Sequence, residues 1–270
     1  MCKVLKVNRS TYYKQVNHVL SVRETEDQVF KEEIKKIFLE SNKRYGAPKI
    51  HSILLAKGIR VSIKRVQRKM AIMGLRSFVV RKYRYYSKSA VTEERKNILN
   101  QDFTATTVNQ KWCTDITYIH SVKDGWTYLA SVMDFYSKKI IGWAFSKQMT
   151  TELALKAVQN ACLNVKETEG IILHSDLGSQ YTSVQFEEYL KSKGIKHSFS
   201  RKGCPYDNAC IESFHSVLKK EEVNLNRYYD FKEAYSAIFE YIESWYNRTR
   251  VHGSLNFKTP DAVHEAALTA

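Results

Sequence analysis

The sequence predicts an α/β protein, in which a mixed sheet with flanking helices follows a small all-α domain. Hydrophobic residues in the first part of the chain recur at helical spacing. After residue 110 the pattern changes to short runs rich in aromatic and β-branched residues, which is typical of strands. Further on, such runs alternate with amphipathic stretches, as in a sheet covered by helices. With 270 residues, the chain is long enough for one large domain or two small ones.

The all-α part is expected to contain three helices. Amphipathic spacing predicts the first over 26–42, Gly46 then breaks the chain, and Pro48 suits the first turn of a second helix over 49–57. Ser62 is a good N-cap for the third, which we expect to run to about residue 73. The buried stripe of the third helix is expected to be Ile63, Val66, Met70 and Met73, and the cations of its other face are Lys64, Arg65, Arg68 and Lys69.

Two helices joined by a short turn, with basic residues on the second, form the pattern of a helix-turn-helix DNA reader. We assign residues 1–75 to this region, although the same spacing also fits a small helical bundle. Residues 76–108 are expected to be a basic linker, whose first half interleaves cations with aromatic residues and so suits phosphate contact and base stacking. The DNA contacts predicted in the linker are Arg81, Lys82 and Arg84.

Positive charge is concentrated in the first two-fifths of the chain. Residues 1–108 hold 24 Lys and Arg against 9 Asp and Glu, whereas residues 109–270 hold 19 of each. From Ser41 to Thr92 there are 14 basic residues and no acidic one. A basic block on one module is typical of a polyanion binder, most often of nucleic acid. A solvated basic face and attraction to acidic membranes are the alternatives.

The cysteine pattern and the hydropathy bear on where the protein works. The five cysteines are scattered and contain no CxxC pair, so we expect a reducing cytosol, no disulfide framework and no structural zinc. No run of about 18 apolar residues occurs, and the basic N-terminus lacks the apolar region of a signal peptide. We therefore expect a cytoplasmic protein without a membrane span.

The second part of the chain is expected to hold five strands. Three of them are joined by short turns into an antiparallel meander, and helices alternate with the rest. The predicted strands are 111–120, 126–135, 140–146, 171–175 and 195–199, and the predicted helices are 151–168, 183–193, 208–222 and 231–247. This is the order expected for a ribonuclease H-like fold. We assign the core to 109–225 and a C-terminal helical extension to 226–270.

Three acidic residues stand out in this core. Asp115 lies within the first strand, where a buried carboxylate is costly without a partner. Asp176 directly follows an apolar strand, and Glu212 shares one helix face with Asn208, His215 and Lys219. Taken singly, each acid fits a cap or a paired charge. If the three carboxylates converge, their like charges raise one another's pKa. Hard divalent cations such as Mg²⁺ or Mn²⁺ remove this repulsion by binding the carboxylate oxygens. Two such ions can activate an attacking oxygen and stabilise a leaving oxygen at phosphorus.

Strings around these acids resemble the DDE transposases of bacterial insertion sequences, and most closely the B reading frame of insertion-sequence family three, which is related to retroviral integrases. The strings are DITY from Asp115, HSDLGSQYTS around Asp176 and RKGCPYDNACIESFHSVLKKE around Glu212. The 35 residues between Asp176 and Glu212 match the separation in that family. RYGAPKI from Arg44 and WYNRTRVHGSLNFKTPDAV from Trp245 extend the resemblance over almost the whole chain, although Cys204 stands where the family more usually has Asn.

The resemblance implies a DNA transposase or integrase that cuts and joins the ends of an insertion sequence. Asp115, Asp176 and Glu212 would be catalytic and would hold two Mg²⁺ or Mn²⁺ ions. Lys219 would contact DNA near the cut, and Asn208 would assist the site. The implied partners are DNA at the element ends and target, a second copy of the chain on DNA, and an upstream A-frame protein or fusion. The implied location is the bacterial cytoplasm, at the nucleoid.

Other interpretations stay open at this point. A nuclease of the same fold would cut without joining, and a DNA-binding regulator would use the helical domain beside an inert sheet. A serine hydrolase built on His174 and Ser175 is disfavoured, because no G-x-S-x-G turn is present and adjacent strand residues point to opposite faces. The four tryptophans, Trp112, Trp126, Trp143 and Trp245, are expected to pack in the core.

Overall fold

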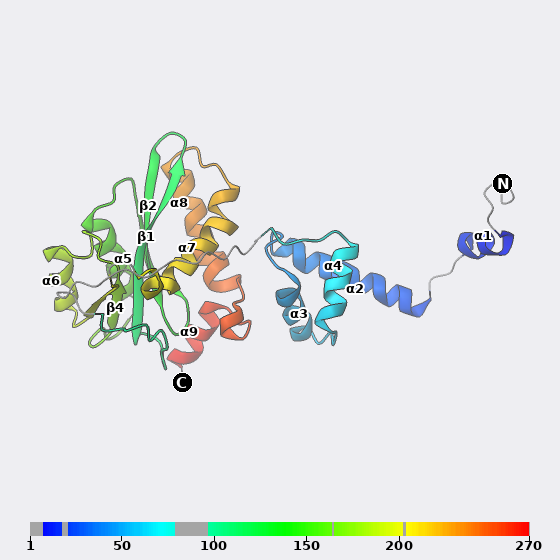
Figure 1. The fold of residues 1–270 in the computed structure, drawn as a ribbon, viewed down its shortest axis with the longest axis horizontal. Coiled ribbons are helices and arrows are strands. Elements are labelled where there is room, and N and C mark those ends of the chain that lie inside the picture. The colour runs from blue at the N-terminus through cyan, green and yellow to red at the C-terminus, as the bar shows by residue number, and fades with distance from the viewer. Residues whose placement is uncertain (1–7, 18–20, 79–96, 164, 202–203, 270) are drawn as a thin grey trace. The chain divides into compact units, whose positions relative to one another are not determined.

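The protein divides into two compact units, Met1–Val80 and Arg81–Ala270, in the computed structural model (Figure 1). The structure describes residues 8–17, 21–78, 97–163, 165–201 and 204–269. The predicted DNA contacts Arg81, Lys82 and Arg84 lie outside these residues. The predicted domain limits at residues 75, 108 and 225 stay a prediction. Among the described helices, none combines the length and the hydropathy that crossing a membrane requires.

The first unit is helical, as the sequence predicts. Its helices are α1 (Arg9–Val16), α2 (Val22–Glu40), α3 (Ala47–Ala56) and α4 (Ile63–Ile72). Helix α2 begins earlier than predicted, because Ser21 and Glu24 form a capping box in which each side chain accepts from the other's backbone N–H. Ser62 caps α4 as expected, by accepting from the Arg65 N–H. Val66 and Met70 are buried, but Ile63 is 37% exposed, so its predicted burial is wrong.

The second unit is built on a five-stranded mixed sheet, which confirms the predicted ribonuclease H-like class. The strands run in the order β3-β2-β1-β4-β5. β1, β2 and β3 form the predicted antiparallel meander, and β4 and β5 run parallel to β1. The strands are β1 (Lys111–Ser121), β2 (Gly125–Asp134), β3 (Ile140–Ser146), β4 (Ile172–Ser175) and β5 (Lys196–Phe199).

Helices cover both faces of this sheet. They are α5 (Thr151–Leu163), α6 (Val184–Ser192), α7 (Ala209–Glu221), α8 (Phe231–Phe239), a π-helical segment (Glu240–Thr249) and α9 (Pro260–Leu268). Cys113, Ile119 and Leu129 face the α7 and α8 side, whereas Trp112 and Ala130 face α5 and α6. Odd-numbered residues of β1 therefore share a face with α7. Helix α9 and the change to π-helical geometry at Glu240 were not predicted.

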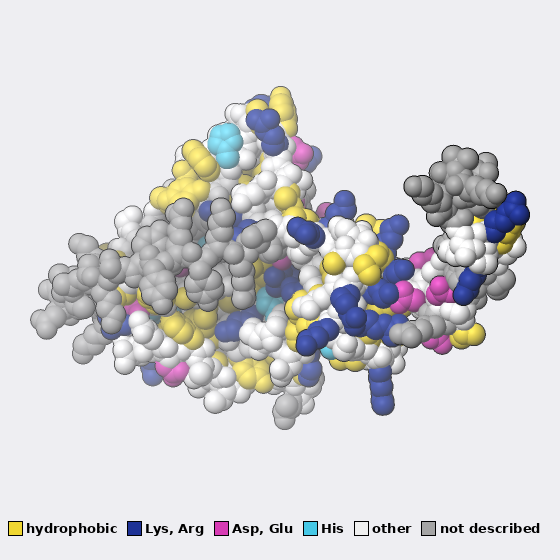
Figure 2. Space-filling view, turned by 45° about the vertical axis from the view of Figure 1, so that its right-hand side comes forward, with side chains coloured by type: hydrophobic (Ala, Val, Ile, Leu, Met, Phe, Trp, Pro, Cys, Tyr) yellow, Lys and Arg dark blue, Asp and Glu magenta, His cyan; other side chains and the backbone are white. Residues whose placement is uncertain are grey.

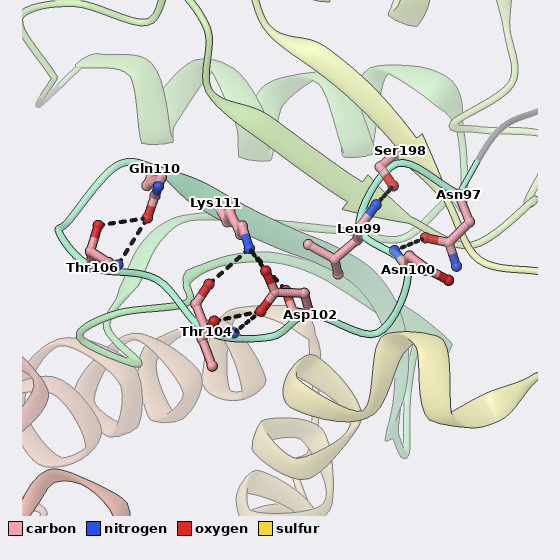
Figure 3. A network of polar contacts seen from close by, with 9 residues as sticks. All are labelled: Asn97, Leu99, Asn100, Asp102, Thr104, Thr106, Gln110, Lys111 and Ser198. Carbon is pink, nitrogen blue, oxygen red and sulfur yellow. Dashed lines mark hydrogen bonds and ion pairs between the residues drawn. The ribbon is translucent and has the colours of Figure 1, made fainter.

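The chain that leads into β1 is fastened to the sheet by polar contacts (Figure 3). The Leu99 N–H donates to Ser198 Oγ on β5 at 3.1 Å. Lys111 Nζ pairs with the Asp102 carboxylate at 2.8 Å and donates to the Thr104 carbonyl oxygen at 2.8 Å. Residues 97–108, which the sequence analysis assigns to the linker, therefore lie against the sheet in this structure.

A buried ion pair joins the end of α7 to the C-terminal extension. Arg250 donates from Nε and Nη2 to both carboxylate oxygens of Glu221, at 3.0–3.1 Å. Tyr241 Oη and Trp245 Nε1 each donate to Glu221 Oε2 at 3.1 Å. Glu221 is 1% and Arg250 8% exposed. Since α7 also carries Glu212, the extension fixes the position of that helix.

Arg250→Ala is expected to lower the free energy of unfolding by about 3–5 kcal/mol, because it removes the opposite charge of Arg250 from beside the buried Glu221 carboxylate. Urea denaturation of the full chain measures this. Arg248→Ala is the matched control, since Arg248 is 70% exposed and lies 3.8 Å from Asp261, and its expected loss is at most about 1 kcal/mol. Equal losses in the two variants would contradict this role for Arg250.

Candidate functional site

The three predicted acids come from three elements that the fold brings to one region. Asp115 is on β1, on the face that α7 covers, and exposes 23% of its side chain. Asp176 follows β4, the parallel neighbour of β1. The last register pair between the two strands is Cys113 with His174, and Asp115 and Asp176 lie two residues beyond it on their strands. Glu212 is in the first turn of α7, which packs on β1.

Asp115 is the electrostatic partner of the other two acids. Partial burial raises the pKa of Asp176, and the charge of Asp115 raises this pKa further. The Gly178 N–H, which donates to Asp176 Oδ1 at 2.9 Å, acts in the opposite direction and lowers the pKa. Burial and then the Asp115 charge raise the pKa of Glu212. Like charges that share a site disfavour each other's ionised form. The arrangement therefore concentrates negative charge around Asp115.

Residues of β1 and α7 hold the Asp115 carboxylate in place. Asp115 Oδ1 accepts from the Ile116 N–H at 2.8 Å, and Oδ2 lies 3.4 Å from His215 Nδ1. Asn208, at the start of α7, donates from Nδ2 to the Thr114 carbonyl oxygen at 3.3 Å. His215 Nε2 and Asn208 Oδ1 are buried, and neither has a hydrogen-bond partner among the described residues. Through the Asn208 Nδ2 bond and the His215 Nδ1 contact, the two side chains tie α7 to the part of β1 that carries Asp115.

A chain of polar side chains holds the backbone at Asp176. Ser175 Oγ donates to the Asp176 carbonyl oxygen at 2.8 Å and lies 2.9 Å from His197 Nε2. His197 Nδ1 lies 3.2 Å from Glu187 Oε1. The order is that of a hydrolase triad, but Ser175 is 0% exposed and cannot meet a substrate. The sequence analysis missed His197 and Glu187, because their partnership with Ser175 depends on the packing of β5 and α6 beside β4.

The donor set suits a hard divalent cation, because three carboxylates offer oxygen ligands and their excess negative charge needs an opposite charge. In the conformation described, the set is open. Throughout residues 8–269, apart from the undescribed segments, no group of three His, Cys, Asp or Glu side chains is close enough to hold one metal ion. The three residue types thus suit a cation, although their side chains do not form a closed ligand set here.

The predicted DNA contacts on α4 fall into two pairs. Lys64 and Arg68 are exposed, and Figure 2 shows many Lys and Arg side chains on one face of the helical unit. Lys69 forms an ion pair with Asp27 of α2, and Arg65 Nη2 lies 3.5 Å from the same carboxylate. The Lys69 hydrogen bond, above other causes, lowers the pKa of Asp27. Arg65 and Lys69 therefore also hold α4 against α2.

Lys219 lies two turns beyond Glu212 on α7 and is half-buried. Its ammonium is on the same helix face as the predicted site, which is the placement that the sequence spacing predicts. Its contact with DNA stays a prediction.

Comparisons with known proteins agree over both units. An integrase core domain matches residues 105–205 and a second integrase core domain matches residues 193–260. An HTH-like domain matches residues 24–83. The catalytic core domain of HTLV-2 integrase, solved in complex with magnesium, superposes with a TM-score of 0.46 at 20% identity, over 60% of this chain and 99% of that one.

Curated relatives match nearly the whole chain. The transposase for insertion sequence element IS904 of Lactococcus lactis subsp. lactis (strain IL1403) is 41% identical over 241 residues, which cover 89% of this chain and 95% of that protein. Transposase InsF for insertion sequence IS3A of Escherichia coli (strain K12) is 38% identical over 267 residues, which cover 97% of this chain and 91% of that protein.

The residue before Asn208 is a second buried anchor for α7. Asp207 is fully buried and accepts from Arg201 Nε and Nη2, both at 3.1 Å. It also accepts from Asn97 Nδ2 at 2.9 Å and Gln101 Nε2 at 2.8 Å. Burial alone raises the pKa of this carboxyl, but the hydrogen bonds of Arg201 and Gln101 outweigh it and lower the pKa to about 2.

A lowered native pKa predicts how Asp207 affects stability with pH. The contribution is fully present above the unfolded pKa, near 4, and is lost as pH falls toward about 2. Asp207→Asn should therefore lower the free energy of unfolding by about 2 kcal/mol at pH 7 and by less at pH 3. Urea denaturation between pH 3 and pH 7 checks this, with the exposed Glu240→Gln as control. A loss that does not change with pH would argue against the assigned role.

Proposed function

The chain belongs to the family of insertion-sequence transposases, and from this premise we propose that it cuts and joins insertion-sequence ends through Asp115, Asp176 and Glu212. The observation that carries the assignment of these residues is the position of Asp115. Its charge raises the pKa of both Asp176 and Glu212, although the three acids are far apart in sequence. Partly buried carboxylates that act on one another in this way suit a bound cation, which would supply the opposite charge.

Asp115, Asp176 and Glu212 would hold two divalent cations, Mg²⁺ or Mn²⁺. Bound cations supply activation of the attacking oxygen and stabilisation of the leaving oxygen. The residues of the chain have their own tasks. His215 and the Ile116 N–H orient the Asp115 carboxylate, and the Gly178 N–H orients that of Asp176.

The proposed reaction is two displacements at phosphorus. In the first, the oxygen of water bonds to phosphorus as the bond to the 3′-oxygen of the element breaks, which leaves a 3′-hydroxyl and a 5′-phosphate on the flank. In the second, that hydroxyl loses its proton and its oxygen bonds to another phosphorus, which releases a new 3′-hydroxyl. Neither displacement needs a covalent enzyme intermediate. The burial of Ser175 is compatible with this, since no serine nucleophile is required.

DNA would be bound by both units. Lys64, Arg65 and Arg68 are exposed on α4, and Lys219 would contact DNA beside the cut. Arg81, Lys82 and Arg84 would add phosphate contacts. Pairing of two DNA ends calls for a second copy of the chain on DNA, and an upstream A-frame protein or fusion would complete the machinery at the bacterial nucleoid.

Substitution of the three acids tests the chemistry. Asp115→Asn, Asp176→Asn and Glu212→Gln should each reduce cleavage and joining by about 10²–10³-fold or more, because each removes a charge that the transition state requires. The substrate is labelled DNA from the ends of the element that encodes the chain, with Mg²⁺, and products are resolved on a gel. Binding of the same DNA in EDTA should persist, and Glu240→Gln should retain both properties.

The same assay separates the alternatives. Cleavage by the unsubstituted chain without a joined product would indicate a non-joining nuclease. Full function in all three variants would indicate a DNA-binding regulator, and loss of binding in all three would count against the assigned roles.

The salt dependence of DNA binding tests the role of α4. Lys64→Ala and Arg68→Ala should each weaken duplex binding and reduce the slope of log K against log salt by about 0.9, because each lost phosphate contact releases one fewer counterion. Arg65→Ala should weaken binding as well, and it should also lower the stability of the helical unit through loss of the Asp27 pair. Unchanged slopes in Lys64→Ala and Arg68→Ala would remove α4 from the interface.

A further inference from the structure

The β1–β2 hairpin has one buried face and one exposed aromatic face. Beyond Asp115, the odd-numbered residues Thr117 and Ile119 are buried, whereas Tyr118 and His120 are exposed. On β2, Trp126 is exposed and Tyr128 half-buried. We name the four aromatic side chains Tyr118, His120, Trp126 and Tyr128 the aromatic platform. In Figure 1 the turn of this hairpin projects at the top of the second unit.

The rings of the aromatic platform are ordered against one another. Tyr118 is directly opposite Tyr128, and His120 directly opposite Trp126. The ring centroids of these pairs are 5.4 Å and 5.1 Å apart, with interplanar angles of 66° and 78°. Tyr118 and Trp126 also meet edge to face at 6.4 Å. Edge-to-face pairs of this kind are favourable and limit ring motion, so the platform is preformed.

No described helix covers the aromatic platform. On the same face of the sheet, Ala130 and Val132 pack with α5, and the half-buried Tyr128 marks the end of that cover. Trp126 is 58% exposed, so its predicted place in the core is wrong. Ordered, exposed aromatic rings in a row are typical of a binding surface and are costly to leave in water.

The charges around the aromatic platform favour a polyanion. Lys123 in the turn is exposed, whereas the ammonium of Lys147 lies 5.5 Å from the centroid of the Phe231 ring. Between Ile116 and Leu129 the only acidic residue is Asp124. The Asp124 carboxylate is engaged by Lys147 Nζ at 2.8 Å and by the Phe231 N–H at 2.7 Å. With Asp124 neutralised by Lys147, exposed aromatic rings beside the exposed Lys123 suit stacked bases with a phosphate next to them.

We propose that the aromatic platform binds unpaired bases of the DNA strand that is cut, by stacking on Tyr118 and Trp126. The proposal rests on the proposed function, because it assigns part of the same DNA path. Tyr118 is three residues after Asp115 on β1, about 10 Å along the strand, and on the opposite face of the sheet. The register of β4 with β1 ends at Cys113, so bases separated from their partners near the cut would pass the edge of β1 beyond that residue to reach the rings, while Lys123 attracts the backbone.

The test is binding of single-stranded oligothymidylate to the full chain in EDTA. All four tryptophans are described, and Trp126 alone among them is exposed, so stacking should quench its fluorescence. Trp126→Ala and Tyr118→Ala should each weaken binding by about fivefold or more. Trp126→Phe should restore most of the affinity, because it keeps a stacking ring. The salt slope should stay as it is, since no phosphate contact is lost.

Tyr229→Ala is the matched control, because Tyr229 is a 62% exposed tyrosine outside the aromatic platform. It should bind oligothymidylate normally, and blunt duplex should bind all variants equally. Unchanged oligothymidylate affinity in Trp126→Ala and Tyr118→Ala would overturn the proposal. Light scattering gives a second contradicting outcome. If the wild-type chain is a dimer and these variants are not, while their DNA affinity is unchanged, the surface binds a second copy of the chain. Because the assay contains no divalent cation, failure of the catalytic assignment would leave its outcome unaffected.

Discussion

Repulsion between Asp115 and the acids Asp176 and Glu212 is the constraint on which the rest of the core depends. Each of those two acids has a pKa raised by burial and by the Asp115 charge. The Asp115 charge therefore adds to the cost of ionising these two acids, which burial already imposes. Among the described residues the three carboxylates do not form a metal ligand set.

The contacts that hold the three acids in place are concentrated on α7 and at the end of β4. At the start of α7, Asp207 binds Arg201 and the chain that leads into β1, and Asn208 reaches the Thr114 carbonyl. At its other end, Glu221 is fixed by Arg250 of the C-terminal extension. Ser175, held by His197, fixes the backbone at Asp176. Residues near the acids in sequence, such as Ser175 and Glu221, thereby connect them to distant ones, such as His197 and Arg250.

Local patterns were enough to predict the sheet, while the role of the three acids stays a prediction, and tertiary contacts account for what was missed. The Asp124-Gly125 turn marked the meander, and Asp115 was conspicuous as the one acidic residue in a strand rich in aromatic and β-branched residues. The same local patterns could not reveal that Arg65 and Lys69 meet Asp27, or that His197 meets Ser175, because each pair is made by packing. Trp126 was misassigned because aromatic content indicates a strand but not which face a helix covers.

The central claim is that Asp115, Asp176 and Glu212 form one cation site that acts on DNA. A crystal structure of the chain with Mn²⁺ and a DNA end, with manganese located by anomalous scattering, tests it most directly. The account predicts manganese bound by oxygens of all three carboxylates, next to a phosphodiester. Manganese bound elsewhere, or three carboxylates still apart with DNA in place, would contradict it.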